Sequence, residues 1–149
     1  SGEFVLMDFG ATYDGWHSDM TRTVCVGKPS DKMKSVYETV LTAQLSALDA
    51  VKAGMSGKAL DKIARDIITE AGYGDNFGHS LGHGVGVEIH ESPYASPSRE
   101  DILPENSIVT VEPGIYLEGK FGVRIEDFVV VTENGCINMT KAPKELICL

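Results

Sequence analysis

The first 26 residues carry the pattern of two strands joined by a turn. Glu3–Phe9 and Ser18–Val26 are the predicted strands, and the Asp14-Gly15 dipeptide between them is a strong turn signal. Along the second strand, one face gathers the polar residues Asp19, Thr21 and Thr23. A hairpin would bring Asp8, near the end of the first strand, close to Asp19. Because two buried like charges repel each other, this pair would require a proton or a cation between the carboxylates.

Two amphipathic helices are predicted next. The first opens at Pro29-Ser30-Asp31 and ends at Gly54, and the second begins after a Ser56 cap and ends before Gly72. Apolar residues recur at helical spacing in both segments, so each helix presents one apolar stripe that can cover a sheet. The stripes contain Met33, Val36, Tyr37, Val40, Leu41, Leu45 and Leu48 in the first helix, and Leu60, Ile63, Ala64, Ile67 and Ala71 in the second.

The rest of the chain alternates between turns and strands. Ser92–Asn106 is predicted as a loop because it holds three prolines. Ile108–Val111 is a predicted short strand, Ile115–Leu117 is extended, and Gly122–Thr132 is the strongest strand of the chain. A final hairpin turn follows at Glu133-Asn134-Gly135. This order predicts an α/β fold in which a curved, mainly antiparallel sheet carries two helices on its outer face.

Composition narrows the possible functions. A chain of 149 residues forms at most one domain. Its formal net charge of −9 argues against binding to nucleic acid or to an anionic membrane, since phosphate binding requires a basic face. No apolar run approaches the length of a membrane helix. A reduced, cytoplasmic protein is expected because the cysteines are odd in number and widely spaced, at Cys25, Cys136 and Cys148.

The stretch Gly78–Glu91 gathers three of the four histidines and four glycines. His79 and His83 are four residues apart, as in helical zinc sites, but glycine at this density makes a helix too costly. Such glycines instead allow backbone to approach a ligand or another strand closely. The alternation over Val85–Ile89 then predicts a strand, with His90 on its polar face. Without acidic partners elsewhere, histidines hydrogen-bonded within a glycine-rich loop would be the simpler interpretation.

Acidic partners do lie on the predicted strands. Asp19, Glu112 and Glu126 occupy polar positions between apolar neighbours, and Asp8 stands at a strand end. A carboxylate within a sheet is costly unless it is paired or bound to a metal. Salt bridges are the alternative, and the strands offer two nearby cations, Arg22 and Arg124. Four carboxylates and one imidazole suit two divalent cations such as manganese, cobalt or iron better than they suit a thiolate zinc site. The residues themselves therefore indicate a two-metal hydrolase.

Several motifs, in order along the chain, resemble the pita-bread metallopeptidases of family M24. The first signature is matched by Leu6-Met7-Asp8-Phe9-Gly10 followed by Ser18-Asp19-Met20-Thr21-Arg22-Thr23. The other signatures are matched by His79–Glu91, Val111–Gly114 and Gly122–Asp127, so the resemblance covers nearly the whole chain. The Asp-Met-Thr-Arg-Thr run favours the branch of Xaa-Pro aminopeptidases and Xaa-Pro dipeptidases (prolidases) over the methionine aminopeptidases.

The resemblance implies a pita-bread fold and a set of site residues. Residues 1–149 would be the C-terminal part of a single metallopeptidase catalytic domain that lacks its first half. The implied cofactors are two divalent ions, with Mn²⁺ favoured and Co²⁺, Fe²⁺ or Zn²⁺ as alternatives, and Asp19 and Glu126 would bridge them. A water shared by the ions would be the nucleophile. The implied metal ligands are Asp8, Asp19, His83, Glu112 and Glu126.

The resemblance also assigns catalytic roles. Glu112 would act as general base and then pass the proton to the departing proline nitrogen. His79 and His90 would hold the substrate carbonyl and stabilise the oxyanion. Arg124 would orient Glu126 or the substrate, or it would serve only as a counter-charge for the acidic site. The implied reaction releases the N-terminal residue of Xaa-Pro peptides or dipeptides, and the implied assembly is a homodimer.

Some features depart from the family pattern. Many prolidases carry an arginine just after the His-Glu pair that binds a dipeptide's free carboxylate, whereas Tyr94 stands here and the nearest cation is Arg99. Without the preceding half of the domain, the chain alone is expected to bind metal weakly or not at all, to self-associate and to have little or no peptidase activity. Alternative functions on the same fold are a metal-free binding module, a methionine aminopeptidase and a creatinase, and the complete ligand set argues against the metal-free module.

Overall fold

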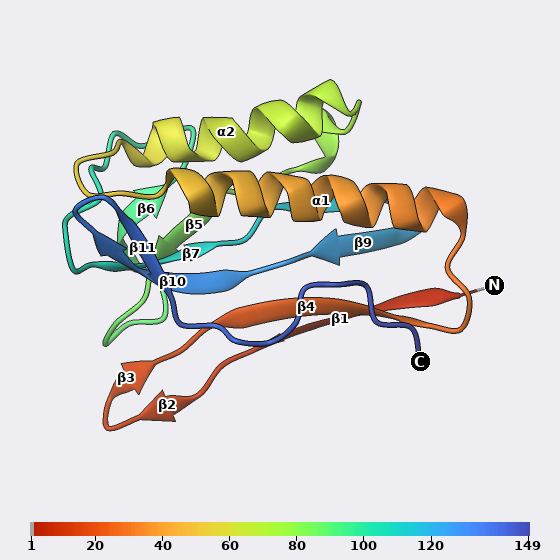
Figure 1. Cartoon of the computed structure of the whole chain (residues 1–149), viewed down its shortest axis with the longest axis horizontal. Helices are drawn as coiled ribbons and strands as arrows, with labels where there is room; N and C mark the ends of the chain where they lie inside the picture. Colours follow the sequence, from red (N-terminus) through yellow and green to blue (C-terminus); the bar gives the residue numbers. More distant parts are fainter. Residues whose placement is uncertain (1) are drawn as a thin grey trace.

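The computed structural model describes residues 2–149 and shows two helices side by side over one face of a group of short strands (Figure 1). In chain order the elements are β1 (Glu3–Phe9), β2 (Thr12–Tyr13), β3 (Trp16–His17), β4 (Met20–Val26), α1 (Asp31–Ala50), α2 (Gly57–Glu70), a 3₁₀ turn η1 (Gly74–Asn76), β5 (Gly82–Gly84), β6 (Glu91–Ala95), β7 (Ile108–Val111), β8 (Gly114–Leu117), β9 (Phe121–Arg124), β10 (Asp127–Thr132) and β11 (Gly135–Asn138).

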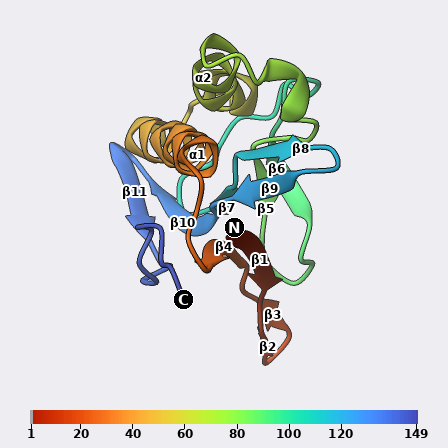
Figure 2. The same ribbon diagram turned by 90° about the vertical axis from the view of Figure 1, so that its right-hand side faces the viewer.

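Antiparallel pairing dominates the strands. Five of them form one sheet in the order β11-β10-β7-β5-β6. β1 and β4 form a two-stranded ribbon in which Asp8 is opposite Thr21, and this ribbon lies on the side away from the helices (Figure 2). An isolated bridge between Thr21 and Glu126 connects β4 to the start of β10. The predicted α/β fold, a mainly antiparallel sheet with two helices on one face, is confirmed.

Both helices begin at the predicted caps. The Ser30 side chain accepts a hydrogen bond from the Met33 N–H, and the Ser56 side chain accepts one from the Ala59 N–H. α1 ends at Ala50, earlier than the predicted Gly54, because the chain leaves the helix at Val51 and Gly54 supplies the left-handed residue of the turn that follows, with φ of 78°. No helix in the part of the chain that the structure describes has both the length and the apolar character needed to cross a bilayer.

The strand predicted over Val85–Ile89 is wrong. β5 ends at Gly84, and the chain then reverses so that Glu91, at the start of β6, pairs with Gly84. Val85 is 3% exposed and Val87 is 63% exposed, so the apparent alternation reflects one core residue and one residue on an exposed loop. Local alternation cannot distinguish these two arrangements, because the reversal is set by the partner strand.

Two further predictions require correction. The predicted loop Ser92–Asn106 begins with strand residues of β6, and this strand contains Pro93 because it is the edge of its sheet, where a missing N–H is tolerated. The predicted single strand Gly122–Thr132 is two strands, since β9 pairs with β8 while β10 pairs with β7. At the break, the Glu126 N–H donates to the Thr21 carbonyl oxygen at 3.1 Å instead of to either neighbour.

A buried ion pair fastens β4 to β10. Arg22 Nη2 lies 2.7 Å from Asp127 Oδ1, and Asp127 is fully buried. The guanidinium also donates to the carbonyl oxygens of Thr21, Glu126, Ala142 and Pro143. The carboxylate accepts further hydrogen bonds from Gln44, Asn138 and Lys144. Burial alone would raise the pKa of Asp127, but the hydrogen bonds from Lys144, Arg22 and Asn138 hold that pKa below its ordinary value.

We predict that Asp127→Asn lowers the free energy of unfolding by about 3–5 kcal/mol, because it leaves the buried Arg22 and the partly buried Lys144 without their carboxylate. Since the folded-state pKa of Asp127 lies below the unfolded-state value, its stabilisation is fully present above about pH 4 and is lost as the pH falls through the folded-state pKa. Urea unfolding followed by circular dichroism measures both effects. The matched control is Asp66→Asn, which breaks an exposed pair with Lys62 and is expected to cost at most about 0.5 kcal/mol. Equal losses in the two variants would contradict the prediction.

Candidate functional site

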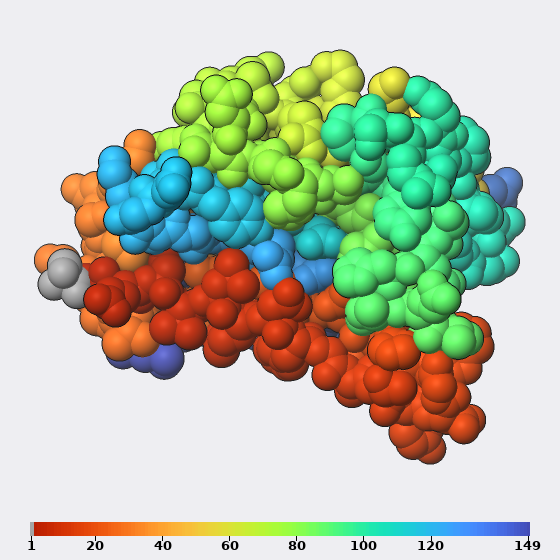
Figure 3. Space-filling view, turned by 180° about the vertical axis from the view of Figure 1, so that it is seen from behind, coloured from red at the N-terminus to blue at the C-terminus, as the bar shows by residue number. Residues whose placement is uncertain are grey.

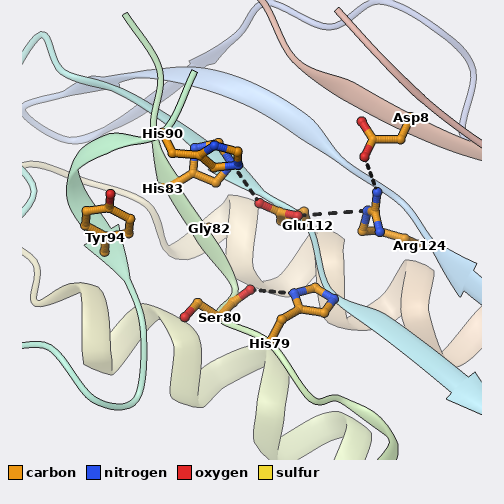
Figure 4. Close-up of a pocket in the computed structure, with 9 residues that line it drawn as sticks. All are labelled: Asp8, His79, Ser80, Gly82, His83, His90, Tyr94, Glu112 and Arg124. Carbon is orange, nitrogen blue, oxygen red and sulfur yellow. Dashed lines mark hydrogen bonds and ion pairs between the residues drawn. The ribbon is translucent and has the colours of Figure 1, made fainter. Parts of the chain in front are cut away.

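A cavity of about 400 Å³ opens on the face shown in Figure 3, where β1 (red), the β8–β9 hairpin (light blue) and the histidine-containing loop (green) meet. Figure 4 shows its interior: Tyr94 lies at one end, the Asp8–Arg124 pair lies at the other, and Glu112 lies between them. Almost all of its lining comes from residues that the sequence singled out. The lining residues are Asp8, His79, Ser80, Gly82, His83, His90, Tyr94, Glu112 and Arg124.

The glycine-rich strand places His83 beside Glu112. A Cβ on Gly82 would lie 2.0 Å from the Thr110 carbonyl oxygen, so only glycine allows β5 to approach β7 this closely. The Thr110 hydroxyl accepts from the His83 N–H at 3.0 Å, and the Glu112 N–H donates to the Leu81 carbonyl at 2.8 Å. As a result, His83 Nε2 lies 3.2 Å from Glu112 Oε1.

Three buried residues from distant parts of the chain converge next to this pair. Asp19, His83 and Glu126 each offer a ligand atom, and these atoms all lie within 4.8 Å of one another. His83 Nε2 is 3.7 Å from Asp19 Oδ2. The hairpin, the glycine-rich strand and the β9–β10 break supply one residue each, so the cluster exists only in the folded chain. Of the five predicted metal ligands, the structure brings four into one cluster, namely these three and Glu112.

The tautomer of His83 suits metal binding. Its Nδ1 lies 3.0 Å from the Gly84 carbonyl oxygen, which can only accept, so Nδ1 carries the proton and Nε2 faces the carboxylates. Burial alone would lower the pKa of His83, but the hydrogen bond to Glu112 and the charges of Glu112 and Asp19 raise it above the ordinary value. A histidine oriented by a carbonyl on its other nitrogen is the usual arrangement of a metal ligand.

The carboxylates of the cluster are only partly compensated by the positive charge beside them, which comes from Arg124 at 3.9 Å from Glu112 Oε2. Burial and the neighbouring charges of Glu112 and Asp19 raise the pKa of Glu126 to about 8, although a 2.5 Å hydrogen bond from the Thr21 hydroxyl opposes the shift. Burial, together with the charges of Asp8 and Glu112, likewise raises the pKa of Asp19. Positive charge placed among these oxygens would remove the repulsion. The donor set, hard oxygens with one oriented imidazole nitrogen, therefore fits divalent cations.

The fifth predicted ligand, Asp8, lines the same cavity but is exposed and is bound by Arg124. Arg124 Nε also donates to the Thr21 hydroxyl at 3.1 Å, and that hydroxyl in turn donates to Glu126. Arg124 therefore contacts three site carboxylates: Asp8 directly, Glu112 through an ion pair of 3.9 Å between Nε and Oε2, and Glu126 through Thr21. The sequence placed Thr21 on the same face as Asp19, and this shared face was the available signal for its position in the site.

Tyr116 is a site residue that the sequence reasoning missed. The His79 Nδ1 lies 2.8 Å from the Ser80 carbonyl oxygen, which can only accept, so Nδ1 donates to it; Nε2 lies 2.9 Å from the Tyr116 hydroxyl, which donates to it in this tautomer. The Tyr116 oxygen accepts from Arg124 Nη1 at 3.0 Å. Burial raises the pKa of Tyr116 against the lowering effect of Arg124, so the hydroxyl keeps its proton. A directed hydrogen-bond chain thus joins Arg124 to His79.

His90 and Tyr94 complete the wall of the cavity. The centroids of the His90 and His83 rings are 4.2 Å apart. His90 lies in the loop between β5 and β6, at the end of the chain reversal. The Arg99 guanidinium lies over the Tyr94 ring, 4.1 Å from its centroid, and 3.3 Å from Asp101 Oδ2. Arg99 is therefore close to the cavity wall, but its charge is already engaged by Asp101.

Comparison with known proteins agrees with this geometry. The model of metallopeptidase family M24 matches residues 1–133. The Xaa-Pro dipeptidase of Pyrococcus furiosus is 53% identical over 146 residues, which cover 98% of this chain and 42% of that protein. The structure titled as the X-Pro aminopeptidase of Thermotoga maritima has a TM-score of 0.95 and 53% identity, with 98% of this chain and 41% of that chain covered.

A second structure, the Xaa-Pro dipeptidase of Bacillus anthracis, has a TM-score of 0.96 and 54% identity, and it is matched over 98% of this chain and 41% of its own length. The chain thus spans about two fifths of the length of the relatives that it matches. The family model covers most of the chain, and the identities lie far above the level at which only the fold is shared. The chain belongs to metallopeptidase family M24.

Proposed function

We propose that residues 1–149 form the C-terminal part of a metallopeptidase catalytic domain that hydrolyses the peptide bond before proline and releases the N-terminal residue. The observation that supports this most strongly is the convergence of Asp19, His83 and Glu126, with Glu112 beside them, inside one cavity. The relatives named Xaa-Pro dipeptidase and X-Pro aminopeptidase support the preference for proline.

The proposed cofactors are two divalent ions, with Mn²⁺ favoured by the oxygen-rich donor set. They would be held by five residues, Asp8, Asp19, His83, Glu112 and Glu126. When bound, such ions lower the pKa of a water molecule and polarise a carbonyl group. Asp8 would then exchange its contact with Arg124 for one with the cation, and Arg124 would retain its hydrogen bonds to Thr21 and Tyr116.

The chain's own residues supply proton transfer and substrate positioning. Glu112 is the proposed general base and acid; the Thr110 hydroxyl fixes its Oε1 by a hydrogen bond of 2.9 Å. His79 and His90 border the same cavity and would contact the substrate carbonyl and its developing negative charge. Arg124 would orient the substrate-facing side of the site through Tyr116 and Thr21.

We further propose that the complete protein is a cytoplasmic homodimer. The cytoplasmic assignment is supported by the free thiols of Cys25, Cys136 and Cys148, which are typical of a reducing compartment. The dimer is supported by the resemblance alone.

The first prediction concerns metal binding. In the complete polypeptide that carries these residues, Asp19→Asn and Glu126→Gln should each lose metal affinity by more than roughly 100-fold, since even residues that only support a ligand contribute about 10–100-fold. Metal content by elemental mass spectrometry and Mn²⁺ titration calorimetry measure this directly. The control Glu133→Gln changes an exposed glutamate in the β10–β11 turn and should bind metal normally. Normal metal content with normal turnover in either site variant would refute the proposed centre.

The second prediction concerns Glu112. At saturating metal, Glu112→Gln should lower kcat for an Xaa-Pro peptide by roughly 10²–10⁴-fold while changing KM much less, because the proton is transferred in the transition state. Glu118→Gln, which lies in the exposed β8–β9 turn, is the matched control. If KM rises while kcat is retained, Glu112 is a binding residue and the proton-transfer role is wrong.

The third prediction concerns substrate length. Tyr94 lines the cavity where the family pattern has a carboxylate-binding arginine, and Arg99 is engaged by Asp101. Tripeptides of the type Xaa-Pro-Yaa should therefore be cleaved at least as well as Xaa-Pro dipeptides, as measured by kcat/KM. Tyr94→Arg should raise kcat/KM for dipeptides by roughly 10-fold or more by restoring a charge-assisted hydrogen bond, whereas Arg99→Gln should leave it nearly unchanged. A strong dipeptide preference in the unmodified protein would contradict this expectation.

A further inference from the structure

Cys25 and Cys148 are neighbours in the fold although they lie near opposite ends of the chain. The two residues form a β-bridge in which the Cys25 N–H donates to the Ile147 carbonyl and the Leu149 N–H donates to the Cys25 carbonyl, both at 2.8 Å. Figure 1 shows this C-terminal segment, in dark blue, running alongside β4. The bridge is parallel and sets the two residues side by side, and the Cys25 thiol contacts the side chain of Cys148. Such proximity is the first requirement of a disulfide, which needs Cα atoms about 4.4–6.8 Å apart.

The two thiols differ in their access to solvent. Cys25 is fully buried, and a Cβ on Gly2 would lie 2.7 Å from its Sγ, so neighbouring backbone covers it. Cys148 is exposed. Burial raises the pKa of the Cys25 thiol, and the adjacent Cys148 raises it further. An external oxidant would therefore meet Cys148 first, and Cys25 is reached only from within the protein.

We propose that Cys25 and Cys148 form a reversible disulfide when the protein meets a low-molecular-weight disulfide such as glutathione disulfide. The thiolate of Cys148 attacks one sulfur of glutathione disulfide, which forms a mixed disulfide and releases one glutathione thiolate. Cys25 then loses its proton and attacks Cys148 Sγ, which forms the Cys25–Cys148 bond and releases the second glutathione. The two protein thiols are oxidised, and one glutathione disulfide is reduced to two glutathione molecules.

The disulfide would restrain the C-terminal segment that contacts the buried Arg22–Asp127 pair. Pro143 and Ala142 accept hydrogen bonds from Arg22, and Lys144 forms an ion pair with Asp127. These contacts adjoin Glu126, because Asp127 follows it in the chain and the Glu126 carbonyl oxygen also accepts a hydrogen bond from Arg22. A disulfide at Cys148 would hold this segment against β4 and would close a loop of roughly 120 residues, which strongly restricts the unfolded chain. Oxidation would thus stabilise the network that supports the candidate metal site.

The test uses the complete polypeptide that carries these residues, incubated with glutathione disulfide in the absence of added metal and compared with the same protein kept in dithiothreitol. We expect intact mass to fall by two hydrogens, peptide mapping to show a Cys25–Cys148 crosslink, and the midpoint of thermal unfolding to rise by roughly 5–15 °C. Dithiothreitol should reverse all three changes.

Three variants make the test specific. Cys136→Ser should oxidise as the unmodified chain does, because Cys136 lies on β11, where its thiol contacts the Leu48 carbonyl. Cys148→Ser should show neither the crosslink nor the stabilisation. Cys25→Ala, which replaces the buried thiol by a smaller apolar side chain, should stop at a glutathione adduct on Cys148. A lasting adduct in the unmodified chain, a crosslink through Cys136 or between two chains, or a crosslink without a rise in the unfolding midpoint would overturn the proposal.

Discussion

The arrangement of the candidate site depends on the buried pair of Arg22 and Asp127. This pair connects β4 to β10 at the position where Thr21 and Glu126 form their bridge. The same guanidinium donates to the carbonyl oxygens of both bridge residues, so the backbone that carries Glu126 cannot shift without breaking hydrogen bonds to a buried cation. Breaking a buried pair costs far more than its net contribution to stability, and for this reason the pair enforces one geometry.

The side chain of Glu126 lies in a cluster of acidic residues. Asp19, Glu112 and Glu126 surround His83, and burial with mutual repulsion raises the pKa of both Asp19 and Glu126. Such a cluster is unfavourable in itself, and it persists because the surrounding strands position it rigidly. The buried pair and the cluster are therefore complementary. Asp127 has two cationic partners, Arg22 and Lys144, which is one more than neutrality requires, whereas its neighbour Glu126 lies among carboxylates whose charge a divalent ion would neutralise.

The relatives bear names for two related activities, a dipeptidase and an aminopeptidase, at nearly the same identity. Overall similarity does not separate these activities, because a relative of each name is 53% identical to this chain. The wall of the cavity is where a substrate carboxylate would be recognised. Tyr94 and the Arg99–Asp101 pair occupy that wall here, and an aromatic ring with a neutralised guanidinium presents no free positive charge to a substrate carboxylate.

The sequence by itself determined the two helices with their serine caps, the first hairpin, the antiparallel α/β class and the chemical character of the site, because capping, turn chemistry and hydrophobic period are local properties. Tertiary structure alone decided the reversal after Gly84, the break before Asp127, and the positions of Tyr116 and of the Cys25–Cys148 bridge. Each of these depends on a partner far away in the chain; Thr21 and Glu126, for example, are separated by 105 positions. Local pattern shows which residues are polar or extended, but only the folded chain specifies which of them meet.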